Sequence, residues 1–127
     1  SYSYVNLGKQ YIDNTYPTRH ELLLGNSLTT VPKYIASNPD KKFDIIFIDG
    51  GHTYDVAKTD IINCKKLAHK DTIVVMDDTI TNPAFVCHWN KGPSQSWNEV
   101  VKLDMIREEG HLDFSKGRGA SWGYYNM

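Results

Sequence analysis

Short runs of apolar residues alternate with stretches of helical periodicity along this chain. Residues 45–48 and 73–76 are the two strongest apolar runs, and they predict strands over residues 43–48 and 71–76. Unbroken runs of this kind predict strands of a parallel sheet whose two faces are both covered by helices. Residues 21–24 predict a weaker strand, and residues 111–114 and 120–125 predict two more strands near the end of the chain.

Apolar side chains at helical spacing predict four helices, over residues 4–14, 30–37, 56–69 and 96–109. Pro32 suits the first turn of the second helix, and Gly110 is expected to end the fourth. Alternating strands and helices indicate an α/β fold with a mostly parallel sheet. Because no repeat or linker divides the chain, we expect residues 1–127 to form a single domain.

Composition and charge exclude several classes of function. The 127 residues are 40% hydrophobic and 23% charged, with a formal net charge of -1, which is typical of a globular protein. We expect no nucleic-acid partner, because no basic excess is available to bind phosphates. The apolar runs are too short to span a membrane. Cys64 and Cys87 form no CxxC pair, which favours a reducing, cytoplasmic location.

Acidic side chains directly follow the two strongest predicted strands. Asp49 comes after residues 43–48, and Asp77 and Asp78 come after residues 71–76. Ligands bind beyond the carboxyl ends of strands in open parallel sheets, so we expect these carboxylates to meet at one rim. Carboxylates brought together raise one another's pKa unless a cation is present. An oxygen-only cluster suits Mg²⁺, with Ca²⁺ or Mn²⁺ as alternatives.

Two other groups of residues are expected at the same rim. His52 lies in a Gly-Gly turn three residues after Asp49, and the ordinary histidine pKa of about 6.5 suits a general base. The polar residues Gly25, Asn26 and Ser27 follow the weaker strand. The structural alternative is that the histidine and the aspartates only cap helices or form turns.

Two sequence blocks resemble class I S-adenosylmethionine-dependent methyltransferases of the small-molecule O-methyltransferase group, which includes catechol, caffeoyl-CoA and macrolide-sugar enzymes. The blocks are FDIIFIDGGHTY at residues 43–54 and TIVVMDDT at residues 72–79. Residues 19–27 and 119–124 are similar to an earlier strand with its polar exit and to the final strand of that family. The resemblance implies a Rossmann-like sheet, mostly parallel, with an antiparallel C-terminal strand.

The resemblance also implies a role for each matching residue. Asp49, Asp77 and Asp78 would bind a divalent cation, most simply Mg²⁺, and His52 would be the catalytic base. Gly25, Asn26, Ser27 and Asp49 would contact S-adenosylmethionine, and a small molecule would accept the methyl group on a hydroxyl, a sugar being one option. The chain would be the carboxyl-terminal part of the domain, without the first two strands and their glycine-rich loop. Exposed strand edges would then favour a homo-oligomer.

Two other classes of protein remain open from the residues alone. A receiver-like signalling module would carry a phosphoacceptor aspartate at Asp49 and an acidic pair at Asp77 and Asp78, although receivers have these in the opposite order. A methyltransferase-like module without catalytic activity, used for binding or assembly, is the third hypothesis.

Overall fold

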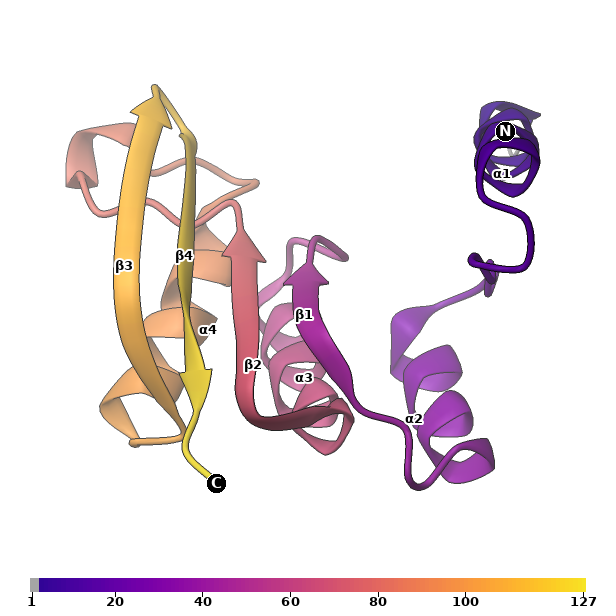
Figure 1. The fold of residues 1–127 in the computed structure, drawn as a ribbon. Helices are drawn as coiled ribbons and strands as arrows, with labels where there is room; N and C mark the ends of the chain where they lie inside the picture. The colour runs from indigo at the N-terminus through magenta and orange to yellow at the C-terminus, as the bar shows by residue number, and fades with distance from the viewer. Residues whose placement is uncertain (1–2) are drawn as a thin grey trace.

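The computed structural model describes residues 3–127, so the first two residues of the predicted domain lie outside the described residues. The α/β class is confirmed (Figure 1). In chain order the elements are α1 (Ser3–Thr15), α2 (Ser27–Ser37), β1 (Phe43–Ile48), α3 (Tyr54–Cys64), β2 (Ala68–Asp77), α4 (Lys91–Lys102), β3 (Ile106–Ser115) and β4 (Arg118–Tyr125), with 3-10 turns at Lys65–Leu67 and Pro83–Phe85.

The four strands form one sheet in the order β1-β2-β4-β3. Strands β1 and β2 are parallel, and Ile48 pairs with Met76 near their carboxyl ends. The last strand, β4, runs antiparallel to both β2 and β3, as expected for a C-terminal strand. Among the four described strands the sheet is therefore mixed, with one parallel pairing beside two antiparallel ones.

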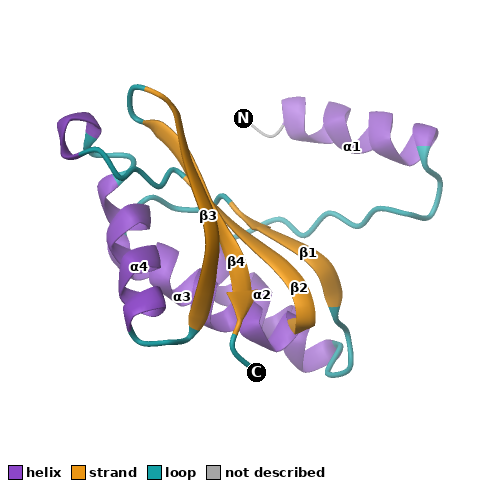
Figure 2. Cartoon of the chain, turned by 60° about the vertical axis from the view of Figure 1, so that its left-hand side comes forward, coloured by secondary structure: helices purple, strands orange, loops and turns teal. Residues whose placement is uncertain are grey.

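Helices cover one face of this sheet. Figure 2 shows α2, α3 and α4 on the same side, while α1 stands apart from the sheet. The covered face holds the core, in which Val74, Trp97 and Val100 are fully buried. On the other face Ile45 is 66% exposed and Phe47 is 60% exposed. The expectation that helices cover both faces of β1 is thus wrong for the described chain, because no described element packs against its second face.

The helix expected over residues 56–69 is shorter, because the last of these residues belong to a strand. Helix α3 stops at Cys64, and β2 already begins at Ala68, which pairs with Phe43. The Thr72 hydroxyl donates to the Phe43 carbonyl at 2.5 Å and fixes this early start.

The helix expected over residues 96–109 is displaced towards the N-terminus. Helix α4 begins at Lys91 and ends at Lys102, and Asp104 has a φ of 62°, which cannot continue a helix. Residues from Ile106 onward belong to β3, because they pair with β4. Gly110 therefore does not end a helix. It lies in β3, where an added Cβ would come within 2.4 Å of the Trp122 ring.

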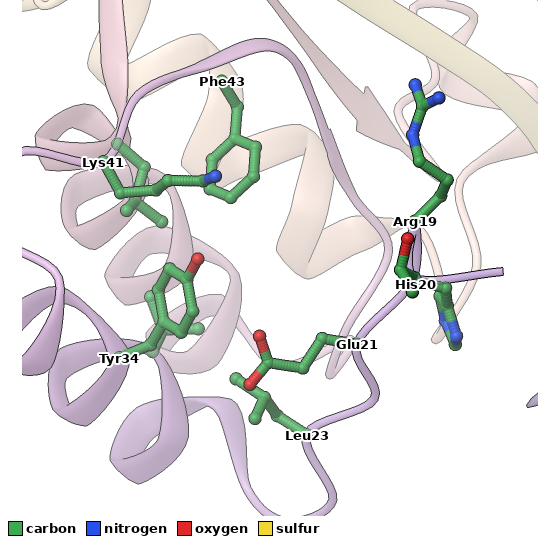
Figure 3. Close-up of a pocket in the computed structure, with 10 residues that line it drawn as sticks. Arg19, His20, Glu21, Leu23, Tyr34, Lys41 and Phe43 are labelled. Carbon is green, nitrogen blue, oxygen red and sulfur yellow. The ribbon is translucent and has the colours of Figure 1, made fainter. Parts of the chain in front are cut away.

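The strand expected over residues 21–24 does not form. These residues pair with no strand in the described part of the chain. The segment instead borders a hollow of about 680 Å³ with α2 and the first residue of β1, Phe43 (Figure 3). Lys41 lies over the Phe43 ring at 5.4 Å in this hollow. None of the predicted site residues lines it, since Asp49 follows the opposite end of β1.

No helix within residues 3–127 combines the length and the apolar character needed to cross a membrane.

Candidate functional site: an Asp-His-Asp cluster at the strand ends

The parallel register of β1 and β2 brings the predicted carboxylates together. Because Ile48 pairs with Met76, the next residues along the two strands, Asp49 and Asp77, are neighbours. Asp78 follows directly, at the point where β2 ends. The parallel pairing of β1 and β2 therefore places these carboxylates at one rim, where the carboxyl ends of the strands meet.

His52 joins this cluster from the loop between β1 and α3. Its Nε2 lies 2.9 Å from Oδ2 of Asp78. One ligand atom each from Asp49, His52 and Asp78 can be chosen so that all three lie within 4.8 Å of one another. The nearby Thr53 side chain caps α3 by accepting from the Val56 N–H, so capping of that helix does not require His52.

The carboxylates strongly influence one another's ionisation. Partial burial raises the pKa of Asp49 to about 6, together with a hydrogen bond that protonated Asp49 donates to Asp77 and the charges of Asp77 and Asp78, while His52 opposes the shift. Burial also raises the pKa of Asp78, and the charge of Asp77 adds to it, whereas His52 and Arg118 act in the opposite direction. A local excess of negative charge is therefore built into this rim, and a bound cation would relieve it.

Asp78 adopts an unusual backbone conformation, with a φ of 60°. This left-handed region is costly for most residues other than glycine, although aspartate and asparagine tolerate it better than others. Such strain persists only where surrounding contacts impose it, and it occurs often at functional sites.

A buried hydrogen-bond network holds the segment that follows Asp78. The Thr79 and Ser121 hydroxyls are 2.8 Å apart, and Nδ1 of His111 lies 2.7 Å from the Ser121 hydroxyl. His111 and Ser121 face each other across a β3–β4 pair. Because His111 also pairs with Asp113, the three side chains form a Ser-His-Asp set. Ser121 is only 1% exposed, however, so its hydroxyl cannot serve as a nucleophile for an external substrate.

Asp113 completes this network and acts as a clamp on residues 81–82. Its carboxylate accepts from the Thr81 N–H and hydroxyl and from the Asn82 N–H, and it is paired with His111. Partial burial alone would raise the pKa of Asp113, but these hydrogen bonds outweigh it and lower the pKa to about 2. The sequence offered no motif for this clamp, because its members lie on different elements that only the fold brings together.

The predicted cofactor contacts have structural tasks of their own. The Asn26 side chain caps α2 by accepting from the Leu28 N–H at 3.0 Å. The Ser27 hydroxyl donates to Oδ2 of Asp60 at 3.1 Å, and Gly25 has a φ of 135° that favours glycine. A Cβ added at Gly50 would lie 3.9 Å from the Ser27 hydroxyl, so the start of α2 borders the loop that carries Asp49.

Asp60, which the sequence did not single out, lies beneath this loop. Its side chain is buried in α3, and Oδ1 has no hydrogen-bond partner in the described part of the protein. Burial raises the pKa of Asp60, and the hydrogen bond from Ser27 opposes that shift. A Cβ at Gly50 would come within 2.8 Å of its Oδ2, which explains a glycine directly after Asp49.

The donor set of the cluster fits a divalent cation. Two aspartates and a histidine converge, and Asp77 lies next to Asp49. Oxygen donors suit Mg²⁺ and Mn²⁺, while an imidazole nitrogen in the inner sphere favours Mn²⁺ or another transition metal. With His52 left outside the inner sphere, the three carboxylates are the oxygen-only set that Mg²⁺ prefers.

Comparisons with known proteins agree with this architecture. The model of a family described as "Methyltransferase domain" matches residues 5–79. Among solved structures, the TDP-rhamnose 3'-O-methyltransferase of calicheamicin biosynthesis is 21% identical, with a TM-score of 0.72 over 98% of this chain and 54% of that one. A Bacillus cereus O-methyltransferase in complex with SAH is 17% identical, with a TM-score of 0.77 over 99% of this chain and 60% of that one. An SAH-bound Podospora anserina methyltransferase is 14% identical, with a TM-score of 0.62 over 98% and 58%.

These likenesses establish the Rossmann-like methyltransferase fold that the sequence predicted. The chain spans only between half and three fifths of the length of these solved structures. Among curated protein sequences, none is significantly similar to this chain. The family match covers more than half of the 127 residues and includes Asp49, His52, Asp77 and Asp78. The chain therefore belongs to the methyltransferase-domain family.

Proposed function

We propose that this chain carries the metal and catalytic residues of an S-adenosylmethionine-dependent methyltransferase that methylates a hydroxyl group of a small molecule. The observation that carries the proposal is the convergence of Asp49, His52 and Asp78 at the end of the parallel strands, with Asp77 beside them. The O-methyltransferases among the similar structures support this reaction, and the TDP-rhamnose enzyme supports a sugar as one acceptor class.

In this proposal the three aspartates hold the cation and His52 handles the proton. A divalent cation at the aspartates would supply positive charge that lowers the pKa of an acceptor hydroxyl. With its Nε2–H donating to Asp78, His52 has a free lone pair on Nδ1 that accepts the hydroxyl proton. Asp78 would stabilise the imidazolium so formed. Bound S-adenosylmethionine would supply the methyl group, with the new O–C bond forming in line as the C–S bond breaks and S-adenosylhomocysteine leaves.

The methyl donor is assigned to the adjoining side of the rim. Gly25, Asn26 and Ser27 would face its adenine, and Asp49 would contribute from the end of β1. Ser27 borders Gly50, so these residues and Asp49 adjoin one another and can line one ligand. A cytoplasmic location and self-association through the free edge of β1 remain part of the proposal.

Cation binding gives the first test, because it needs no methyl acceptor. Isothermal titration of the chain with MnCl₂ and MgCl₂ should give a saturable site that Asp49→Asn weakens at least tenfold, since one of the converging carboxylates loses its charge. The matched control is Asp71→Asn, because Asp71 is an exposed aspartate outside the cluster. Equal binding by both variants would contradict the metal assignment.

Methyl transfer gives the second test. Because this chain by itself would be weakly active or inactive, the assay uses a full-length protein that adds the expected first two strands and glycine-rich loop to this chain. Radiolabelled S-adenosylmethionine and a panel of hydroxylated small molecules, including sugar nucleotides, are incubated with that protein, with and without chelator. We expect transfer that requires the cation and falls at least a hundredfold in His52→Ala. Full transfer by His52→Ala would rule out its role as the base.

A further inference from the structure

A hollow of about 370 Å³ opens beside His52, and none of the three clustered aspartates lines it. The His52 side of the hollow comes from the loop before α3, and the opposite side comes from the start of α4 and the residues before it. Because His52 belongs to both places, a molecule bound in this hollow would lie next to the proposed catalytic base. The hollow is thus a candidate subsite for the methyl acceptor.

The lining of this hollow favours an anion. His88, Lys91 and Gln95 contribute nitrogen-bearing side chains from the α4 side, and none of the described residues that line the hollow is acidic. These three side chains are exposed, so they are accessible to a ligand. Lys91 has no carboxylate partner among the ion pairs of residues 3–127. An ammonium and neighbouring N–H donors without a counter-charge favour a phosphate or carboxylate.

The acidic residue of α4 does not cancel this positive character. Glu99 accepts a hydrogen bond from the Tyr54 hydroxyl at 2.6 Å and forms an ion pair with Lys58. These bonds lower the pKa of Glu99, with Lys58 as the main cause. Its charge is therefore already compensated within the pairing of α3 and α4.

The two walls of the hollow are fixed against each other. A Cβ at Gly92 would lie 2.3 Å from the His52 carbonyl oxygen, so only glycine allows α4 to approach the loop this closely. The Ser96 hydroxyl donates to the Tyr54 carbonyl at 3.0 Å and holds the next turn. The distance between Lys91 and His52 is consequently set by backbone contact, as a specificity subsite requires.

We infer that this hollow binds an anionic group, a phosphate or a carboxylate, of the hydroxylated molecule that accepts the methyl group. The inference rests on the proposed function, and it adds the chemical class of the acceptor. Such a molecule has two poles: its hydroxyl faces His52 and the aspartates, and its anionic group faces Lys91 and His88. The hydroxyl end of the acceptor would lie beside the negatively charged aspartates, and its anionic end beside the positively charged Lys91. The site therefore orients the acceptor and binds neutral alcohols more weakly.

Inorganic pyrophosphate is the probe for the first experiment. The ¹⁵N-labelled chain is titrated with pyrophosphate in the presence of chelator, so that no cation bridges the anion to the aspartates. We expect saturable chemical-shift changes at Lys91, Gly92 and Gln95, and at least a fivefold weaker affinity in Lys91→Ala. The control is Lys102→Ala, an exposed lysine at the other end of the same helix, which should leave the affinity unchanged. Equal weakening by both variants, or changes elsewhere only, would overturn the inference.

Matched sugars separate the two anionic groups. Glucose 1-phosphate, glucuronate and methyl glucoside differ in carrying a phosphate, a carboxylate or no charge. Tighter binding of the phosphate or the carboxylate identifies the preferred group, whereas equal binding of methyl glucoside excludes an anion subsite. A chain that binds a cation through Asp49 but shows no Lys91-dependent anion binding refutes the subsite alone. Anion binding at Lys91 without cation binding leaves the subsite standing and refutes the proposed function.

Discussion

Replacement of Asp113 by asparagine tests the clamp on residues 81–82. The substitution keeps the size of the side chain, but it removes the charge that strengthens the hydrogen bonds from Thr81, Asn82 and His111. A fall of the pKa from 3.8 to about 2 corresponds to roughly 2.5 kcal/mol of stability, at about 1.4 kcal/mol per pH unit. The side chain is 19% exposed, so solvent screening reduces the expected loss to about 1–2 kcal/mol.

The sign of the pH dependence follows from the direction of the shift. Because the pKa of Asp113 is lower in the folded chain, its stabilisation is complete above about pH 5 and is lost as the pH falls towards 2. Asp113→Asn should therefore be less stable than the wild type at pH 7, and the difference should shrink steadily between pH 5 and pH 3.

Urea unfolding monitored by tryptophan fluorescence at pH 7, 5, 4 and 3 measures this difference, since Trp97 is fully buried. Asp40→Asn is the control, because Asp40 is an exposed aspartate outside the network. A difference in the free energy of unfolding between the wild type and Asp113→Asn that stays constant from pH 7 to pH 3 would refute the clamp. Equal losses of stability in Asp113→Asn and Asp40→Asn would also refute it.

Two further substitutions test the packing that positions the site. In thermal unfolding, Gly92→Ala should lower the free energy of unfolding by about 1–3 kcal/mol, because its Cβ would strike the His52 carbonyl. The control is Gly8→Ala in α1, where nothing lies within 4 Å of the added Cβ, and it should be neutral or slightly stabilising in the same measurement. Tyr125→Phe should cost about 1–2 kcal/mol in urea unfolding, since it leaves the buried Ile61 carbonyl without its 2.6 Å hydrogen bond. No loss of stability in Tyr125→Phe would mean that this hydroxyl contributes nothing to the core.

Local sequence predicted those parts of the fold that depend on neighbours in the chain. The bounds of β1 were predicted correctly, because an apolar segment interrupted only by Asp44 lies between a lysine pair and an Asp-Gly-Gly turn. The same reasoning placed Asp49 and Asp77 at strand ends, where the register makes them neighbours. The role of each in catalysis stays a prediction, because the geometry alone does not assign chemistry to a carboxylate.

Features that depend on distant segments were missed. Ala68 fits a helical stripe in sequence, but its pairing with Phe43 places it in a strand. Gly110 looks like a helix end, although the ring of Trp122 explains it. Asn26 and Ser27 follow a pattern shared by ligand contacts and helix caps, and their bonds to Leu28 and Asp60 become visible only in the folded chain.

The left-handed backbone at Asp78 has a consequence for the way this chain can change. Glycine at this position would relieve the conformational cost, and asparagine would tolerate the same backbone without adding a negative charge to the crowded rim. Selection for thermal stability alone would thus favour replacements that remove a carboxylate from the cluster. Thermostability screens of this chain should therefore hold residue 78 fixed.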